Sequence, residues 1–310
     1  MGTMITSFDD LLRGAASLKP KRILVANPAN AETFQAIADA QVKLPTHFLL
    51  VGNRATIEGG LADAGGDPRK AEVVATATVQ EALEKAIGLA RQEKADVLMK
   101  GSVDTSTMMR AVLQDSSGLK TGRLLSDIFI LEFPERKDNK LIMITDGGMS
   151  LSLELKNKVD LIKNAVFVAH ALGNPDPKVA VLSATEFVLP NLQSTLDAAA
   201  LSKMNERGQI KGCVVDGPLA LDNAISPEAA EEKGIRSKVA GRADILLAAN
   251  IESANSLAKS TTYFAGLRLA HVIVGSRIPI LIPSRADKSD AKLLSIATGM
   301  LMSEQPWKEE

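Results

Sequence analysis

Short apolar segments alternate with longer amphipathic segments along almost the whole chain. In the first half, the apolar runs predict strands at residues 22–27, 48–52, 72–77 and 96–99. The amphipathic segments between them predict helices at residues 31–40, 79–93 and 105–113. Because short buried strands separated by helices are typical of parallel sheets, the pattern indicates an α/β fold with helices on both faces of each sheet.

Two apolar runs in the middle of the chain are joined by a charged turn instead of a helix. Residues 127–133 and 140–145 flank this turn and therefore predict an antiparallel pair. The alternation then returns, with strands expected at residues 178–183, 212–216, 243–248, 271–275 and 278–282 and helices at 153–172, 195–207, 251–264 and 290–302. Gly173 and Gly208 follow two of these helices, a position where glycine commonly ends a helix.

The two series of strands predict two doubly wound α/β domains with an interdomain cleft. A chain of 310 residues is long enough for two domains of ordinary size. We place the break between them at Asp146-Gly147-Gly148. The first domain is expected to comprise residues 1–146 and about 286–310, and the second domain residues 147–285.

Composition and charge exclude several classes of protein. Only one Trp and one Tyr occur, so the core is expected to be aliphatic. The formal net charge of −1 argues against general affinity for nucleic acid or anionic membranes. No apolar run approaches the roughly 20 residues that span a bilayer, and residues 1–10 lack the pattern of a secretory signal. Together with a single cysteine, Cys213, these features predict a cytoplasmic protein without nucleic-acid or membrane partners.

The turn at Ser284 and Arg285 is the strongest candidate for chemistry. It follows the apolar run 278–283 and precedes the last expected helix, at the kind of strand end where α/β sheets bind ligands. Helix capping by Ser284, with Asp287 and Asp290 as acidic residues of the first turn, is the alternative explanation. It does not explain Arg285, because a cation in a first turn opposes the helix dipole. The pair therefore indicates a phosphate or acyl-phosphate site.

Three more turns at the ends of expected strands carry polar residues. The first contains Lys100, Gly101 and Ser102 before Thr105, and here capping of the next helix is an equally simple explanation. The second contains more polar groups than a turn requires: Asp216, Gly217, Pro218, Asp222 and Asn223. Its Gly-Pro pair predicts the turn itself. The third begins at Asn250, a natural helix cap, and continues with polar residues on one face of the helix: Glu252, Asn255 and Lys259.

Arg123 is a second candidate anion binder, although a solvated loop arginine explains it equally well. Other sequence signals are absent: neither a phosphate-binding Gly-x-x-x-x-Gly-Lys-Ser/Thr loop nor a Gly-x-Gly-x-x-Gly turn occurs, and no Cys/His cluster has metal-ligand spacing. The scattered His47, His170 and His271 are interpreted as structural or surface residues, and Cys213 as a packed strand residue.

Four segments resemble the family of phosphate acetyltransferases and phosphate butyryltransferases. They are residues 215–226 (VDGPLALDNAIS), 239–246 (VAGRADIL), 283–287 (PSRAD) and 99–105 (MKGSVDT), the last being closer to the butyryl branch. The resemblance spans nearly the whole chain. It implies acyl transfer between coenzyme A and inorganic phosphate, with coenzyme A as a substrate and no bound cofactor or metal. It also implies a homodimer and a fold similar to isocitrate and isopropylmalate dehydrogenases.

The resemblance also implies roles for individual residues. Ser284 and Arg285 match the family's serine-arginine pair directly. For the aspartate that follows the pair, an ungapped match reaches Ala291, so Asp290 is our choice and Asp287 the alternative. The hypothesis is direct attack of the coenzyme A thiolate on the acyl phosphate, without a covalent enzyme intermediate. Two alternatives stay open: a non-catalytic acyl-CoA-binding or regulatory homologue, and a metal- and NAD-dependent dehydrogenase of the same fold.

Overall fold

The computed structural model describes residues 4–151, 153–284 and 286–305. Contacts between Cα atoms divide the chain into two compact units. The central unit comprises Leu124–Leu269 with the first residues up to Ser7, and the terminal unit comprises Phe8–Arg123 with the chain from Ala270 onward. The domain limits expected from the sequence, near residues 146 and 285, stay a prediction.

The terminal unit contains a mostly parallel sheet with strand order β3-β2-β1-β4-β11-β10. Its strands are β1 (Lys21–Ala26), β2 (Thr46–Gly52), β3 (Ala71–Ala75), β4 (Val97–Lys100), β10 (Leu269–Val274) and β11 (Ile280–Leu281). Adjacent strands from β3 to β11 run parallel, whereas β10 runs antiparallel to β11. The carboxyl ends of β1, β4 and β11 therefore lie at one edge of this sheet, together with the amino end of β10.

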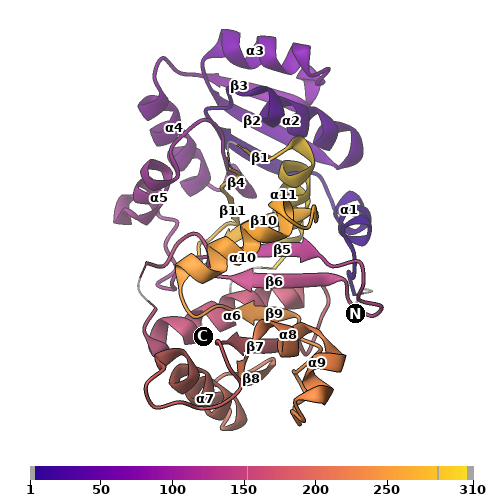
Figure 1. Cartoon of the computed structure of the whole chain (residues 1–310). Coiled ribbons are helices and arrows are strands. Elements are labelled where there is room, and N and C mark those ends of the chain that lie inside the picture. Colours follow the sequence, from indigo (N-terminus) through magenta and orange to yellow (C-terminus); the bar gives the residue numbers. More distant parts are fainter. Residues whose placement is uncertain (1–3, 152, 285, 306–310) are drawn as a thin grey trace. The chain divides into compact units, whose positions relative to one another are not determined.

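Helices lie on both sides of the terminal sheet. They are α1 (Phe8–Ala16), α2 (Ala31–Lys43), α3 (Arg54–Asp63), α4 (Val79–Arg91), α5 (Thr105–Leu113) and α11 (Ser289–Met302), with short 3-10 turns at Pro68–Lys70 and Asp115–Ser117. Helix α11 packs against α1 and α2, while α4 packs against α5 (Figure 1). Side-chain caps begin three of them, since Asn30, Asn53 and Thr78 each accept a hydrogen bond from the backbone N–H three residues later.

The strands of the central unit follow one another in the order β5-β6-β9-β7-β8. Its strands are β5 (Ser126–Glu132), β6 (Leu141–Thr145), β7 (Lys178–Leu182), β8 (Val214–Leu219) and β9 (Ile245–Leu247). Strands β5 and β6 pair antiparallel, which confirms the pair predicted around the charged turn. The other pairs, β6 with β9, β9 with β7 and β7 with β8, are parallel, so their carboxyl ends share one edge.

The helices of the central unit are α6 (Leu155–Ala171), α7 (Gln193–Glu206), α8 (Leu221–Ile225), α9 (Pro227–Glu232) and α10 (Ile251–Tyr263). Helices α6 and α7 pack together against the strands, and α8 packs with α9. The two predicted C-cap glycines are confirmed: Gly173 has φ 83° and Gly208 has φ 74°, a left-handed conformation that glycine adopts without a steric penalty.

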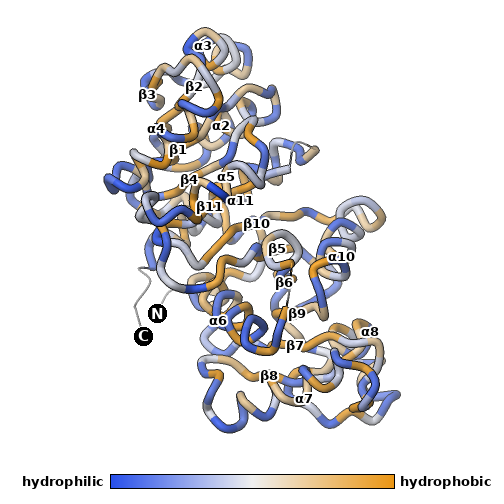
Figure 2. Tube along the Cα trace, turned by 90° about the vertical axis from the view of Figure 1, so that its left-hand side faces the viewer, coloured by the Kyte–Doolittle hydropathy of each residue, from blue (hydrophilic) through white to orange (hydrophobic). Residues whose placement is uncertain are grey.

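Aliphatic side chains fill the core of each unit, as the composition predicts. In the central unit one buried cluster joins β5, β6, β7, β8 and β9 to α8, α9 and α10, and most of its members are Ala, Leu, Ile and Val. The strands of both units are mainly hydrophobic, whereas hydrophilic residues concentrate in helices and loops (Figure 2). Among the described residues, no helix is both long and apolar enough to cross a membrane.

One expectation about local structure is wrong. Gly217 and Pro218 were expected to form a turn after the strand, but both lie within β8. Strand β8 is the last strand of the central sheet, and the register of its pairing with β7 shifts between Ala180 and Leu182. An edge strand with an irregular register tolerates a residue that lacks a backbone N–H, because no ladder hydrogen bond has to be given up.

Candidate functional site

Three connections meet at one edge of the terminal sheet. Strands β1, β4 and β11 are parallel neighbours, with Ala26 opposite Lys100 and Leu281 opposite Met99. The chain that follows each strand therefore emerges at the same level of the sheet. These connections carry Asn27 to Asn30, Gly101 to Asp104, and the turn of Ser284. The geometry brings the Lys100 and Ser284 turns, predicted separately, to one place.

The turn after β11 is fixed by Asp287. Its Oδ2 atom accepts a hydrogen bond from the backbone N–H of Ser284 at 2.7 Å. The same oxygen lies 3.7 Å from Nε2 of His271, a residue near the amino end of β10. Burial alone would raise the pKa of Asp287, but His271, the Ser284 N–H and the nearby Lys292 together hold it below its ordinary value. Arg285, the predicted anion binder, lies outside the described residues.

Asp290 has a different environment from Asp287. It lies in the first turn of α11 and is exposed. One residue earlier, the backbone N–H of Ser289 donates to Oε2 of Glu32 at 2.8 Å, which ties the start of α11 to the first turn of α2. The Asp290 carboxylate is thus exposed beside the Ser284 turn, whereas the half-buried Asp287 holds that turn.

The turn after β4 packs tightly against the chain after β1. A Cβ atom on Gly101 would lie 2.4 Å from the carbonyl oxygen of Asn27, so only glycine fits there. Ser102 donates its backbone N–H to Asn27 O at 2.7 Å, and Asn27 returns a bond from Nδ2 to Ser102 O at 3.1 Å. Asn27 itself has φ 57°, a conformation in which asparagine is enriched. The two connections thus behave as one rigid element.

The other predicted residues of this turn are partly used by the fold. The Lys100 side chain is 3% exposed, and its ammonium donates to Val103 O at 3.1 Å. The Ser102 hydroxyl is 3.4 Å from Nδ2 of Asn30, and Thr105 is the half-buried first residue of α5. Of the four predicted residues, Ser102 and Thr105 are half-buried, whereas Lys100 and Gly101 are buried.

Arg123 is attached to a different part of the terminal unit. Two residues before it, the Thr121 hydroxyl donates to Gly275 O at 2.5 Å, and Lys120 forms a β-bridge with Ser276. Gly275 and Ser276 follow the carboxyl end of β10, the end opposite His271. The contacts that anchor the Arg123 segment therefore lie away from the Ser284 edge.

In the central unit, the second predicted group extends from inside β8 to the helix after it. Asp216 lies in the strand, where its Oδ1 accepts from the backbone N–H of Gly217 at 2.8 Å. Asp222 is exposed and forms an ion pair with Lys233 at 3.0 Å, which lowers the pKa of its carboxyl. Asn223 is fully buried and accepts the Gly241 N–H through its backbone carbonyl at 2.8 Å.

The third predicted group lies at the same edge of the central sheet. Asn250 caps α10 as expected, accepting from the Ser253 N–H at 2.9 Å. Asn255 donates from Nδ2 to Gly147 O at 2.8 Å and so fastens α10 to the loop after β6. Glu252 and Lys259 are exposed on this helix. The face shared by these residues thus serves both packing and solvent contact.

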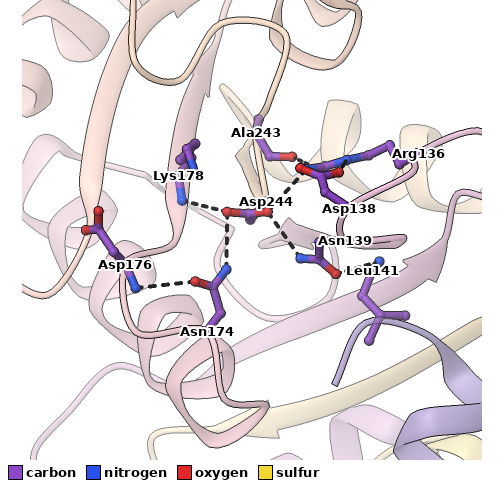
Figure 3. Close-up of polar contacts among 9 residues, drawn as sticks. All are labelled: Arg136, Asp138, Asn139, Leu141, Asn174, Asp176, Lys178, Ala243 and Asp244. Carbon is purple, nitrogen blue, oxygen red and sulfur yellow. Dashed lines mark hydrogen bonds and ion pairs between the residues drawn. The ribbon is translucent and has the colours of Figure 1, made fainter. Parts of the chain in front are cut away.

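Asp244, in the quoted segment 239–246, organises the opposite edge of the central sheet (Figure 3). It is 5% exposed and precedes β9. Its carboxylate accepts from Asn139 Nδ2 at 3.1 Å, Asn174 Nδ2 at 3.2 Å and the backbone N–H of Lys178 at 2.9 Å. Because these donors belong to three separate segments, the role of Asp244 is structural.

The comparisons with known proteins agree with these motifs. Residues 69–299 match the family described as phosphate acetyl/butaryl transferase. The phosphate butyryltransferase of Clostridium acetobutylicum is 41% identical over 300 residues, which cover 97% of this chain and 99% of that protein. The chain belongs to the phosphate acetyl/butyryl transferase family. It is a phosphate acyltransferase, as the resemblance of its motifs implies.

Solved structures show the same fold. A crystal structure of a branched-chain phosphotransacylase from Enterococcus faecalis V583 matches the transferase with a TM-score of 0.81 and 26% identity, covering 91% of this chain and 99% of that one. A Salmonella typhimurium structure described as a 4-hydroxythreonine-4-phosphate dehydrogenase matches with a TM-score of 0.57 and 13% identity, over 92% and 100% of the two chains. The second match concerns the fold alone, and the predicted α/β fold is confirmed.

Several residues that hold the turns at this edge were not expected from the sequence of the transferase. Asn27 holds the Ser102 turn, and the others hold the Ser284 turn and the start of α11: Glu32, His271 and Lys292. One signal was readable: Lys292 interrupts an otherwise apolar helical stretch. His271 gave no signal, because its partner Asp287 is brought to it only by the antiparallel pairing of β10 with β11. Within residues 4–151, 153–284 and 286–305, no group of three or more His, Cys, Asp or Glu side chains is placed to hold a metal ion.

Proposed function

We propose that this transferase moves a short-chain acyl group between coenzyme A and inorganic phosphate, converting acyl-CoA and phosphate to acyl phosphate and coenzyme A. The observation that carries the proposal is the position of Ser284, on a turn between β11 and the start of α11. Such a turn suits anionic substrates, because backbone N–H groups and the helix dipole favour negative charge at a helix N-terminus. Membership of the family supports the same reaction.

In the direction of acyl-CoA formation, a carboxylate first removes the proton of the coenzyme A thiol. The free thiol is mostly protonated near neutral pH, so a base increases the fraction of reactive thiolate. The sulfur then attacks the carbonyl carbon of the acyl phosphate, and the tetrahedral intermediate collapses. The bond from carbon to the phosphate oxygen breaks with its electron pair on phosphate. No acyl group is attached to the enzyme at any stage.

Each residue of the turn has a proposed role in these steps. Ser284 donates a hydrogen bond to the developing oxyanion or to the sulfur, and Arg285 binds the phosphate and stabilises its leaving charge. Asp290 is the proposed base. Its exposure at the start of α11 supports this choice over Asp287, whose carboxylate is engaged with Ser284 and His271 and whose lowered pKa makes it a weaker base.

The remaining predicted residues are proposed to bind the substrates. In the terminal unit they are Lys100, Gly101, Ser102, Thr105 and Arg123, and in the central unit Asp216, Gly217, Pro218, Asp222, Asn223, Asn250, Glu252, Asn255 and Lys259. Because orientation of two substrates can contribute roughly 7 to 11 kcal/mol to catalysis, many of these contacts are expected to affect rate through positioning. A homodimer and a cytoplasmic location, both expected from the sequence, stay predictions.

A thiol-release assay tests the reaction. The enzyme is incubated with phosphate and acetyl-, propionyl-, butyryl- or acetoacetyl-CoA, and free coenzyme A is measured with a thiol reagent. Release that depends on phosphate and produces acyl phosphate is expected with at least one of them. One methylene in an apolar pocket changes the barrier by about 1 to 3 kcal/mol, so the panel also ranks the acyl chains. Absence of turnover with the whole panel contradicts the proposal.

Two variants and one mass measurement test the mechanism. Ser284→Ala should lower kcat by about 10²- to 10³-fold, the usual effect of removing an oxyanion donor. Ser303→Ala is the matched control, because this hydroxyl donates to Met300 O at 2.7 Å beyond the other end of α11. Enzyme mixed with acyl-CoA in the absence of phosphate should show no acyl mass increment. An acyl mass increment of one per enzyme chain would contradict direct attack and indicate a covalent intermediate.

A further inference from the structure

Lys292 is a buried cation in a helix that otherwise presents small and apolar residues to the core. Its residue exposure is 1%, and the ten positions of α11 that follow it are all buried. Lysine is almost never fully buried unless it is paired, because removing an ammonium group from water costs free energy. Burial lowers the pKa of Lys292, while the charges of Asp287 and Glu32 oppose that change. A leucine or methionine would occupy this position without the cost of burying an ammonium group. The charge of Lys292 therefore needs a specific explanation.

The ammonium group of Lys292 is directed at the backbone of the Ser284 turn. It donates to the carbonyl oxygen of Asp287 and lies 3.4 Å from that of Ser284. The Asp287 carboxylate accepts the backbone N–H of the same serine at 2.7 Å. A buried cation therefore contacts the C=O of Ser284, and a carboxylate contacts its N–H. The peptide groups on both sides of this residue, and with them the direction of its side chain, are fixed by two charged groups.

The carboxylate and the cation are themselves supported from neighbouring elements. His271 on β10 faces Asp287, and its backbone N–H donates to the Ser295 hydroxyl of α11 at 3.0 Å. Glu32 on α2 accepts from the first N–H of α11. This cluster thus joins β10, α2 and α11 to one turn. The contacts of this cluster with Ser284 are made to its backbone, whereas the Ser284 hydroxyl accepts from the N–H of Ala286 at 3.4 Å.

We propose that Lys292 is a positioning residue for Ser284 in acyl transfer. The inference rests on the proposed function, since it assumes that Ser284 acts on the substrate. Lys292 does not touch the reacting atoms. It holds the carbonyl of Ser284, so that the hydroxyl donates in the direction that the developing charge requires. A displacement of about 1 Å at such a donor can cost on the order of 10²-fold in rate.

A double-mutant cycle between Lys292→Met and Ser284→Ala tests this role. Methionine has a similar shape without the charge. We expect Lys292→Met to lower kcat by about 10- to 100-fold with KM for acyl-CoA and phosphate within about twofold, because an interaction made only in the transition state is lost. In the Ser284→Ala background the same change should have little further effect, because the group that Lys292 positions is already gone. If the role of Lys292 were purely structural, Lys292→Met would lower kcat by the same factor in wild type and in Ser284→Ala.

The controls separate the possible outcomes. Thr298→Val removes a buried hydroxyl from the same helix, one that bonds only within α11 to Leu294 O among the described contacts, and it should leave kcat unchanged. If Lys292→Met loses a native melting transition, Lys292→Gln, whose side chain is uncharged and one atom shorter, takes its place in the cycle. The inference is overturned if the folded Lys292 variant has wild-type kcat. It is also overturned if the factors by which the two single substitutions lower kcat multiply in the double variant, as they do for independent residues. Wild-type kcat in Ser284→Ala instead overturns the proposed function.

Discussion

The carboxylate of Asp287 accepts a hydrogen bond from the backbone N–H of Ser284, with 2.7 Å between Oδ2 and N. This contact makes Asp287 part of the turn that presents the serine, and it separates the two aspartates that the sequence could not distinguish. Asp290, three residues later, is exposed in the first turn of α11. The two carboxylates should therefore respond differently to the same substitution.

Asp290→Asn is expected to lower kcat by about 10²- to 10⁴-fold, the range typical for loss of a general base. The melting temperature should change little, because the side chain is exposed. Steady-state kinetics in the direction of acyl-CoA formation, with a thermal melt of each variant, provides the check. Asp287→Asn is the matched comparison and should lower the melting temperature more than Asp290→Asn does. If Asp290→Asn has the same kcat as wild type, the base is a group other than Asp290.

Two glycines should respond in opposite ways to the same added methyl group. Gly101→Ala places Cβ against the backbone of Asn27 and Ala26, which cannot move aside as a flexible side chain can. We expect a loss of about 1 to 3 kcal/mol in the free energy of unfolding. Gly88→Ala, inside α4 with no atom within 4 Å of the new Cβ, should stabilise by about 0.4 to 1 kcal/mol. Urea unfolding of the three proteins gives both values, and stabilisation by Gly101→Ala would contradict the tight packing of this turn.

Most of the fold could be predicted from the sequence because its elements are defined by local pattern. The helix beginning at Thr105 and ending at Leu113 was predicted at these same residues, and the antiparallel pair of β5 and β6 followed from a charged turn between apolar runs. The Gly217-Pro218 pair could not be placed correctly. A Gly-Pro pair is a turn signal by local rules, and only the edge position of β8 allows it inside a strand.

The candidate site could be predicted only in part, for a similar reason. Ser284 and Lys100 stand at strand ends, which is a local property, and parallel pairing brings their turns together. The contacts that hold Ser284 come from Lys292, eight residues later, and indirectly from His271 on another strand. Their partners are determined by strand order and helix rotation, which no local pattern contains. Buried polar contacts of this kind therefore cannot be predicted from the sequence alone.

Asp244 is expected to be among the least replaceable residues of the central unit. Asp244→Ala would leave the amide groups of the buried Asn139 and the half-buried Asn174 without their acceptor. Each unsatisfied donor costs about 1 to 3 kcal/mol, so the free energy of unfolding should fall by about 3 kcal/mol or more. Asp138→Ala is the control, since that side chain is 74% exposed and its ion pair with Arg136 should contribute less than about 1 kcal/mol. Urea unfolding, monitored by circular dichroism, gives the free energy of unfolding of each variant. Equal losses in Asp244→Ala and Asp138→Ala would contradict the structural role of Asp244.

Asp146 and Asp127 should make stability depend on pH in an unusual direction. Asp146 is fully buried in the loop after β6, where its carboxylate accepts four backbone N–H groups, including those of Gly148 and Ser150. Burial first, and the charge of Asp127 second, raise the pKa of Asp146 above its ordinary value. The folded protein thus keeps a proton that the unfolded chain loses above about pH 4. The stabilising contribution is complete below that pH and is lost as the pH rises through the folded pKa.

Asp127→Asn tests this dependence because it removes the repelling charge and keeps the shape of the side chain. The pKa of Asp146 should fall towards its ordinary value, so the variant should lose less stability than wild type between about pH 4 and pH 7. The measurement is the difference in free energy of unfolding between these two pH values for each protein, which cancels any pH-independent cost of the substitution. Asp63→Asn, at the exposed last residue of α3, should leave this difference unchanged. A steeper loss of stability in Asp127→Asn than in wild type would show that Asp127 does not repel Asp146.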